Sequence, residues 1–186
     1  VNDEIKKESA EIIDCLHKMN IKTILLTGDK ELTANKVAKE LNINHVYSQL
    51  LPENKLEILE NEIKIKSKKS SVLYVGDGIN DTPSLKLADV GIAISGLGND
   101  EAVETSDVVL LSDNMNSLVK TIKISKFTKT ILIQNIVFSL VFKFAALLIG
   151  TIGILGSYGM LLGVLADVGV CLLTILNTLR ILKKEK

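Results

Sequence analysis

The sequence predicts an α/β domain built on a parallel sheet, followed by a two-helix transmembrane hairpin. Over the first two-thirds of the chain, short runs of β-branched and aliphatic residues alternate with helical patterns, which is typical of strands joined by crossover helices. In the last third, residues 131–179 contain only two side chains of Asp, Glu, Lys or Arg type, although the whole chain carries 22 basic and 22 acidic residues. The charged part therefore suits water, and the apolar part suits the interior of a membrane.

The composition excludes several classes of protein. With 12 Gly, 2 Cys and 47% hydrophobic residues, the chain is neither collagen-like, nor a disulfide scaffold, nor disordered. A formal net charge of zero provides no overall basic field, so we expect no nucleic acid partner. Cys15 and Cys171 are expected to form no disulfide, because a cytosolic location keeps thiols reduced.

The expected elements of the α/β part follow from its periodicity. Helices are expected where apolar residues recur every three or four positions, and strands where a short aliphatic run ends in a turn. In chain order we expect a helix over 3–19, a strand over 22–26, a helix through Val37 and Leu41, a strand over 45–47, a helix over 53–65 opened by Pro52, a strand over 72–75, a helix from about 80 to 87, and strands over 90–94 and 108–111.

The apolar third is long enough for two membrane spans. Four glycines within 150–159 divide it into two runs of roughly 20 residues, and each run at about 1.5 Å per residue matches a bilayer core of about 30 Å. A buried helical hairpin in a soluble protein is the alternative. Lysines and an arginine flank both runs, and the loop between them carries no charge, so both ends are expected in the cytoplasm.

Acidic turns follow two of the expected strands. Asp29 and Asp77 each lie two residues past a strand end, and Asp81 follows shortly afterwards. Because ligands collect at the carboxyl ends of parallel strands, these carboxylates predict a site for a hard divalent cation such as Mg²⁺. Lys55 is a counter-charge for a phosphate at the same place. Each of these features alone is weak evidence for a binding site, since an Asp-Gly turn is commonly only a turn.

Several motifs of the chain resemble those of P-type ATPases. TGD at 27–29, LLPENK ending in Lys55, GDGINDTPSLKLADVGIAI at 76–94 and GNDEAVETSD at 98–107 resemble the phosphorylation domain of that family, which has a haloacid-dehalogenase-like fold with a Rossmann-type parallel sheet. Gln134-Asn135, Lys143 and residues 165–182 resemble the last two spans of the heavy-metal subgroup that exports zinc, cadmium and lead.

The resemblance implies a division of the chain. Residues 1–125 would be the carboxy-terminal portion of the cytoplasmic phosphorylation domain, residues 126–182 the last two transmembrane helices (about 131–150 and 159–180), and residues 183–186 a cytoplasmic tail. It implies a multi-pass protein of the plasma membrane, with the remaining polypeptide (actuator domain, nucleotide-binding domain and earlier spans) as its partner besides the lipid bilayer.

The resemblance also implies roles for site residues. Mg²⁺ would be held by Asp77 and supported by Asn80 and Asp81, while ATP would be bound by a nucleotide domain outside this chain. The phosphoryl group would be held by Thr27 and Gly28, beside Asp29, with its charge offset by Lys55. The family's nucleophile is the aspartate of a DKTGT motif, and that motif does not occur here. The chain alone is therefore expected to be inactive.

Two charges stand alone in the apolar third. Lys143 lies 12 residues after Ile131 and Asp167 lies 12 residues before Leu179, so in antiparallel helices both are about 18 Å from the cytoplasmic boundary. Charges at this depth are usually paired and functional. One hypothesis is a structural salt bridge. The other, which the resemblance implies, makes Asp167 a ligand of the transported cation and Lys143 its counter-ion after release.

Two questions about function stay open at this point. The Asp167 carboxylate favours zinc-like ions over copper, which prefers sulfur ligands, and Cys171 on the same helix face serves either close packing or metal binding. The leading hypothesis is the carboxy-terminal part of an ATP-driven exporter of Zn²⁺, Cd²⁺ or Pb²⁺. The alternative is a stand-alone membrane-anchored phosphatase-like or regulatory module without pump activity.

Overall fold

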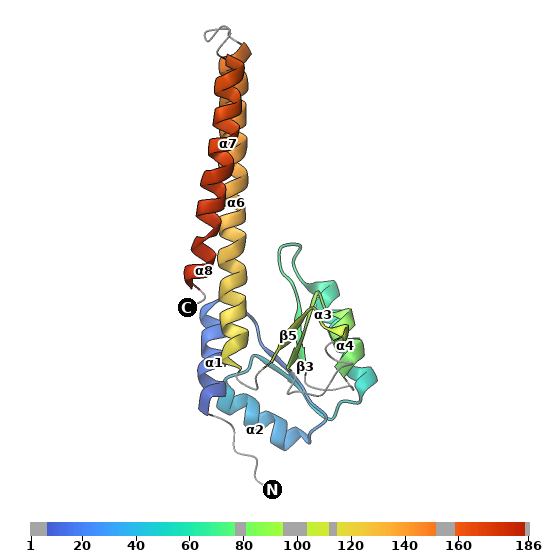
Figure 1. The fold of residues 1–186 in the computed structure, drawn as a ribbon. Helices are drawn as coiled ribbons and strands as arrows, with labels where there is room; N and C mark the ends of the chain where they lie inside the picture. Colours follow the sequence, from blue (N-terminus) through green and yellow to red (C-terminus); the bar gives the residue numbers. More distant parts are fainter. Residues whose placement is uncertain (1–6, 77–80, 95–103, 112–114, 152–158, 185–186) are drawn as a thin grey trace. The chain divides into compact units, whose positions relative to one another are not determined.

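The computed structural model divides the chain into two compact units, Val1–Val119 and Lys120–Lys186, which we describe separately (Figure 1). It describes residues 7–76, 81–94, 104–111, 115–151 and 159–184. Two of the site residues predicted above, Asp77 and Asn80, lie outside the described residues, and Asp81 is the first residue described after them.

The first unit alternates helices and strands as the sequence predicts. Every expected strand and helix is present, with ends within about four residues of the expected ones. In chain order the elements are α1 (Lys7–Lys18), β1 (Ile24–Leu26), α2 (Glu31–Leu41), β2 (His45–Tyr47), α3 (Pro52–Ile65), β3 (Leu73–Gly76), α4 (Thr82–Leu87), β4 (Val90–Ile94) and β5 (Val108–Leu110). Pro52 opens α3 because a proline at the first helical position lacks only an N–H that would be unpaired there anyway.

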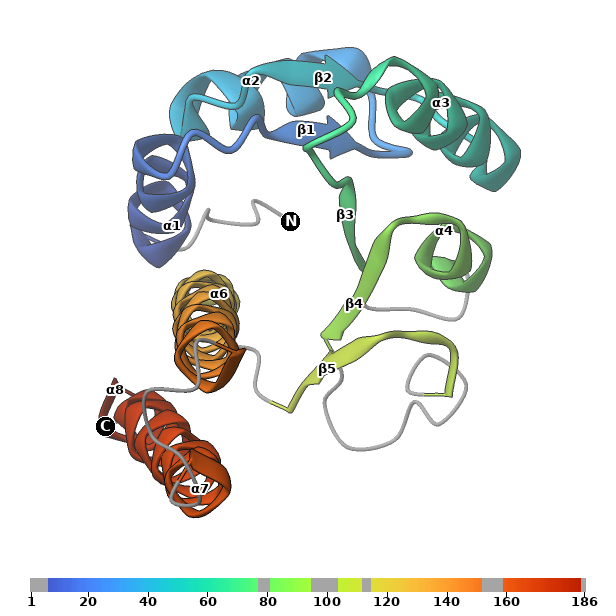
Figure 2. The same cartoon turned by 90° about the horizontal axis from the view of Figure 1, so that it is seen from above.

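The strands are all parallel but form two sheets rather than one. β1 pairs with β2, aligning Leu25 with Val46, whereas β3, β4 and β5 form a second sheet in which Val75 aligns with Ile92. Figure 2 shows the two groups of strands separately. The expectation of a single sheet is therefore correct for strand direction and wrong for continuity, because no described strand pairs with both β1 and β3.

One apolar core nevertheless serves both sheets. Its buried members are Leu59 of α3, Tyr74 of β3, Leu85 of α4 and Ala93 of β4, and Leu26 of β1 packs against them. The α4 helix lies close to β4. A Cβ atom added to Gly91 would come within 2.9 Å of the carbonyl carbon of Leu85 and nearer still to its oxygen, so only glycine fits this contact.

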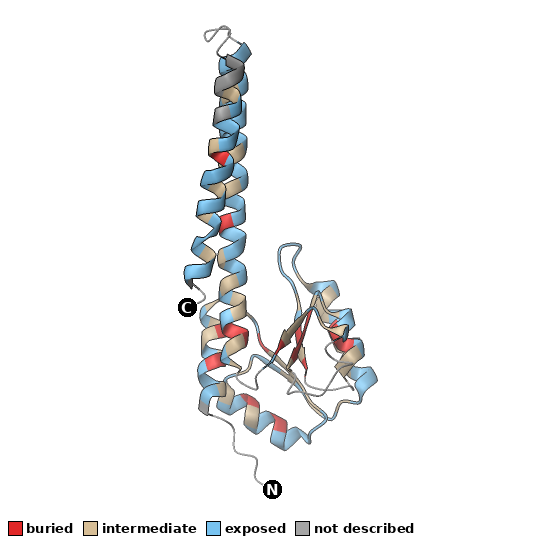
Figure 3. Ribbon diagram, viewed as in Figure 1, coloured by how far each residue is buried: buried red, intermediate tan, exposed pale blue. Residues whose placement is uncertain are grey.

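The second unit consists of long apolar helices. It holds most of α6 (Asn116–Thr151), then α7 (Gly159–Thr178) and the short α8 (Arg180–Lys184). Among the described residues, α6 is the one helix that is both long and apolar enough to cross a membrane, and only 6% of its most apolar stretch is buried. Exposed positions dominate both helices in Figure 3. A helix that is apolar on all sides and so little covered suits lipid better than the core of a soluble protein.

Candidate phosphate and cation sites

The TGD loop after β1 is fastened to the segment that follows β2. Thr27 donates its N–H to the carbonyl of Tyr47 at 3.0 Å and accepts one from Leu50 at 3.1 Å, while Gln49 donates its N–H to the carbonyl of Asp29 at 2.9 Å. A Cβ on Gly28 would lie 3.4 Å from the Leu50 oxygen. That is an ordinary van der Waals distance, so the backbone hydrogen bonds, rather than the lack of a side chain, hold these two turns together.

A side-chain hydrogen bond fixes the conformation of this loop. The Thr27 hydroxyl donates to Oδ2 of Asp29 at 2.9 Å and accepts the Asp29 N–H at 3.1 Å. Both Gly28 and Asp29 are exposed. The loop thus presents a hydroxyl and a carboxylate to solvent in a fixed arrangement, directly after the carboxyl end of a strand.

Lys55 and Asp81 form the second part of the candidate site. The Lys55 ammonium, near the start of α3, lies 3.0 Å from Oδ1 of Asp81, just before α4, and their side chains are only 21% and 14% exposed. The phenol of Tyr74 donates to the same oxygen at 2.9 Å. The sequence interpretation named Lys55 and Asp81 but missed Tyr74; the available signal was a tyrosine within the aliphatic strand run, because a buried phenol needs a hydrogen-bond partner.

Gly76 provides room for the Asp81 carboxylate. A Cβ on Gly76 would lie 2.9 Å from Cβ of Asp81 and 3.0 Å from its Oδ2. The next residue, Thr82, has a buried hydroxyl oxygen without a hydrogen-bond partner among the described residues. Asp81 is therefore held at the end of β3, directly beside the segment that contains Asp77 and Asn80.

The chemistry of these groups fits Mg²⁺ and a phosphate. Carboxylate and hydroxyl oxygens are ligands that Mg²⁺ prefers, and a lysine suits a phosphate oxygen. The described residues contain no group of three His, Cys, Asp or Glu side chains that could hold a metal. The described residues would supply only part of the ligands of a Mg²⁺ ion, with Asp81 as the carboxylate among them, and they do not form a complete protein cage.

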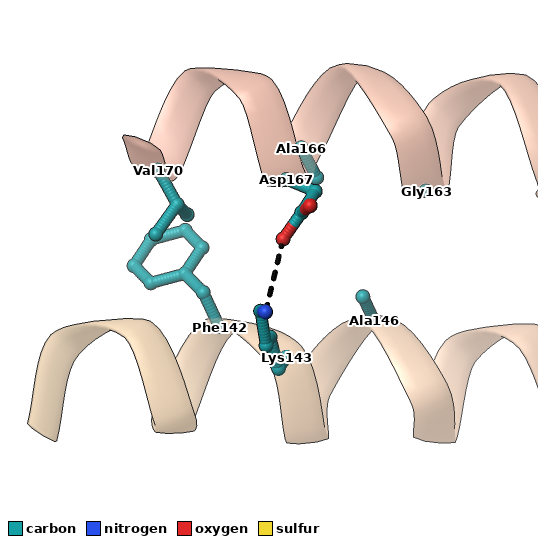
Figure 4. A pocket seen from close by; sticks show the side chains of 7 residues that line it. All are labelled: Phe142, Lys143, Ala146, Gly163, Ala166, Asp167 and Val170. Atoms are coloured by element: carbon teal, nitrogen blue, oxygen red, sulfur yellow. Dashed lines mark ion pairs between the residues drawn. The ribbon is translucent and has the colours of Figure 1, made fainter. Parts of the chain in front are cut away.

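The two charges of the apolar helices meet in the second unit. Nζ of Lys143 on α6 lies 3.3 Å from Oδ1 of Asp167 on α7, and the side chains are 65% and 64% exposed. They line a pocket of about 190 Å³, shown in Figure 4, where the ammonium and the carboxylate point toward each other. The other lining residues are apolar: Phe142, Ala146, Gly163, Ala166 and Val170.

A cluster of polar side chains also joins α6 to α7. Nδ2 of Asn135 donates to the Thr174 carbonyl at 3.2 Å and to the Thr178 hydroxyl at 3.0 Å, and Asn177 donates to Oδ1 of Asn135 at 2.8 Å. Residue numbers rise along α6 from Asn135 to Lys143 while their partners fall along α7, so the helices are antiparallel. The cluster thereby sets the register in which Lys143 opposes Asp167.

Comparisons with known proteins agree with this architecture. The family model described as haloacid dehalogenase-like hydrolase matches residues 1–89. A zinc-transporting ATPase of Synechocystis sp. (strain ATCC 27184 / PCC 6803 / Kazusa) is 42% identical over 184 residues, which are 98% of this chain and 25% of the relative. A cadmium, zinc and cobalt-transporting ATPase of Bacillus subtilis (strain 168) is 42% identical over 187 residues, covering 98% of this chain and 26% of the relative.

A solved structure extends the similarity to three dimensions. The crystal structure of a zinc-transporting PIB-type ATPase in its E2.Pi state superposes with a TM-score of 0.86 at 34% identity, covering 97% of this chain and 28% of that one. The chain spans about a quarter of the length of the curated relatives it matches. Over nearly its whole length the chain is therefore similar to one segment of zinc- and cadmium-transporting ATPases, and its first 89 residues match the haloacid dehalogenase-like hydrolase model.

Proposed function

We propose that this chain is the carboxy-terminal segment of an ATP-driven exporter of heavy-metal cations of the Zn²⁺, Cd²⁺ and Pb²⁺ class. The observation that carries the proposal is the Lys143–Asp167 pair, at 3.3 Å between two apolar helices, on the same chain as a domain with carboxylates at the ends of parallel strands. One part suits phosphoryl transfer and the other suits a cation within a membrane. The names of the relatives, which include zinc and cadmium transporters, agree with this cargo.

In this proposal α6 and α7 both cross the plasma membrane and both ends of the pair are cytoplasmic. Lys120, Lys123, Lys126 and Lys129 precede the apolar part of α6, and Arg180 and Lys183 follow α7. Such residues accumulate on the cytoplasmic side of membrane proteins. The α/β domain, which precedes the first span, then also lies in the cytoplasm.

The α/β domain would supply part of the phosphate and Mg²⁺ site. Thr27, Gly28 and Asp29 would bind phosphate oxygens through the loop and its backbone, and Lys55 would offset their charge. Asp77, Asn80 and Asp81 would hold Mg²⁺. When bound, the ion neutralises negative charge on the phosphate, and the protein's part in such a reaction is mainly positioning and electrostatic stabilisation.

The rest of the polypeptide would complete this site. The described part leaves β1 paired only with β2 and β3 paired only with β4. A further parallel strand between them would join the two sheets and bring its carboxyl end to the loops that carry Thr27 and Asp81. The missing nucleophilic aspartate and the nucleotide-binding domain would come from that remainder.

Asp167 would bind the exported cation and Lys143 would replace it after release. The ammonium lies within contact of the carboxylate, so in the absence of cargo it neutralises a charge that would be costly in lipid. Both side chains are about two-thirds exposed on this helix pair. In a bilayer that exposure requires cover from further helices, which would add the remaining cation ligands.

A chimera tests the proposal. The chain would replace the matching quarter of the Synechocystis zinc-transporting ATPase, and metal-stimulated ATP hydrolysis would be measured with Zn²⁺, Cd²⁺ and Pb²⁺. We expect Asp167→Ala to abolish metal stimulation, whereas Asp14→Ala, which removes an exposed carboxylate of α1, should leave it near the parent value. Metal-stimulated turnover that survives Asp167→Ala would refute the ligand role.

The same chimera tests the cytoplasmic site. Asp77→Asn should block Mg²⁺-dependent formation of the phosphoenzyme from ATP, measured by incorporation of labelled γ-phosphate. Undiminished phosphorylation would remove Asp77 from the Mg²⁺ site.

A further inference from the structure

We propose that Tyr74 is a positioning residue of the phosphate site, whose hydroxyl holds the Asp81 carboxylate in the orientation that pairs with Lys55. This inference rests on the function proposed above, because it assigns a role within that site. Tyr74 acts through Asp81 and needs no contact with phosphate or cation.

The contacts around Asp81 carry the proposal. Oδ1 of Asp81 accepts a hydrogen bond from the Tyr74 phenol at 2.9 Å and lies 3.0 Å from the Lys55 ammonium. Tyr74 is 8% exposed, and the side chain of Asp81 is 14% exposed. Hydrogen bonds to a charged group are stronger than neutral ones and strengthen further where water is largely excluded.

The phenol is held in place by the core. Its ring belongs to the buried cluster that includes Leu59 of α3 and Leu85 of α4. Leu59 and Lys55 are four residues apart on α3, so they lie on one face of that helix. The same face therefore packs on the Tyr74 ring and brings Lys55 to the carboxylate that Tyr74 orients.

Gly76 leaves room for the carboxylate on its other side. A Cβ at this position would lie 3.0 Å from Oδ2 of Asp81, so any residue with a side chain would displace that oxygen. With Oδ1 bonded to Tyr74 and Lys55, the carboxylate has one favoured orientation, in which Oδ2 occupies the space beside Gly76.

Packing in the apolar core does not explain why residue 74 carries a hydroxyl group. A phenylalanine would fill the same apolar volume, and burying a phenol oxygen costs free energy unless a hydrogen bond compensates it. Here the compensating acceptor is a carboxylate of the candidate site. The Tyr74 hydroxyl thus orients the Asp81 carboxylate rather than filling space in the core.

Zero-length cross-linking tests the proposal on the full 186-residue chain in detergent micelles. A carbodiimide joins an amine to a carboxylate only where they touch, and mass spectrometry measures the Lys55–Asp81 product relative to the Lys66–Asp89 product, a second ion pair of the same unit. We expect Tyr74→Phe to lower this ratio about three- to tenfold, the effect of losing one hydrogen bond of typical net strength in a protein. Tyr47→Phe makes the same change at a half-exposed tyrosine and should leave the ratio unchanged, and Asp81→Asn should abolish the product.

Each outcome decides the proposal. An unchanged or higher ratio in Tyr74→Phe overturns it. If this variant also loses the Lys66–Asp89 product and is therefore unfolded, Tyr74→Met replaces the ring with another apolar side chain and is judged by the same ratio.

The chimera gives a second readout. Tyr74→Phe should raise the Mg²⁺ concentration for half-maximal phosphorylation about three- to tenfold, with a smaller change in the rate at saturating Mg²⁺. An unchanged Mg²⁺ dependence would overturn the positioning role. A chimera that is never phosphorylated, even without substitutions, counts against the proposed function alone, because the cross-linking ratio still decides the role of Tyr74.

Discussion

At the scale of single residues, Asp89 fastens the start of β4 to the neighbouring elements. Its carboxylate accepts hydrogen bonds from the Lys66 ammonium, at the end of α3, and from the N–H of Val72 at 2.7 Å. The Lys66 ammonium holds the pKa of the Asp89 carboxyl below its ordinary value, and the Val72 N–H acts in the same direction. Asp89 therefore favours the folded state most when it is ionised.

This geometry predicts a pH-dependent contribution to stability. Because the folded-state pKa of Asp89 lies below the unfolded value of about 3.9, its stabilisation is fully present above that pH and is lost as the pH falls through the folded pKa. We expect Asp89→Asn to lower the unfolding midpoint by a few degrees at pH 6 to 7, and the difference from the parent chain to shrink steadily below about pH 4. Tyrosine fluorescence of Tyr47 and Tyr74, in a Tyr158→Phe background, follows the melting. A difference that stays constant down to about pH 3 would show that the charge is not responsible.

Single residues also show which parts of the candidate site could not be predicted from the sequence. Residue type and strand-end position were enough to single out Asp29, Lys55 and Asp81 as site candidates, and the family resemblance added Thr27. They did not identify Tyr74, because a tyrosine within an aliphatic strand run indicates a buried hydroxyl that needs a partner but does not tell which residue that partner is. The meeting of Lys55 with Asp81 likewise depends on how α3 packs against α4, which no local pattern specifies.

At the scale of elements, the packing of α4 on β4 depends on a glycine. A Cβ at Gly91 would collide with the backbone of Leu85, which is itself 1% exposed and cannot move aside easily. We expect Gly91→Ala to reduce the free energy of unfolding by about 1–3 kcal/mol, the usual cost of overpacking. Urea denaturation followed by the same tyrosine signal would measure it.

Gly150→Ala is the matched control for that substitution. Nothing lies within 4 Å of a Cβ at Gly150, which is in α6, so the same added methyl group should leave the unfolding midpoint of the first unit unchanged. Equal effects of the two substitutions would mean that the contact with Leu85 is not the cause.

Helices and strands were predictable where a local sequence pattern defines them, and less predictable where they depend on contacts with distant parts of the chain. Periodicity located β2 and β4 to the residue, and Pro52 marked the start of α3. The helix α6 begins at Asn116, well before the apolar run that starts at Ile131. Hydropathy marks the part of a helix that is suited to lipid and does not mark where the helix begins. Strand pairing was not predictable at all, since periodicity contains no information about which edges meet.

For the molecule as a whole, the two sheets indicate where a further strand of the longer polypeptide proposed above would bind. They share one core, with Leu26 of β1 packed against the cluster around Tyr74, yet β1 and β3 have no hydrogen-bonded partner on their second edges among the described strands. Unpaired edges expose backbone N–H and C=O groups that tend to pair with another strand. A strand from the remainder is the natural partner in the function proposed above.

Hydrogen–deuterium exchange tests this dependence. In a parallel pair the backbone groups of a strand point alternately to its two sides, so half of the amides of β1 and β3 face the unpaired edges. We expect peptides covering Ile24–Leu26 and Leu73–Gly76 to exchange faster in the chain alone than in the chimera, because the added strand protects those amides. The central strand β4, paired on both sides in the chain alone, is the internal control and should exchange at the same rate in both. If β1 and β3 are equally protected with and without the remainder, no strand joins the sheets, and the nucleophile would have to approach Thr27 and Asp81 from outside the sheet.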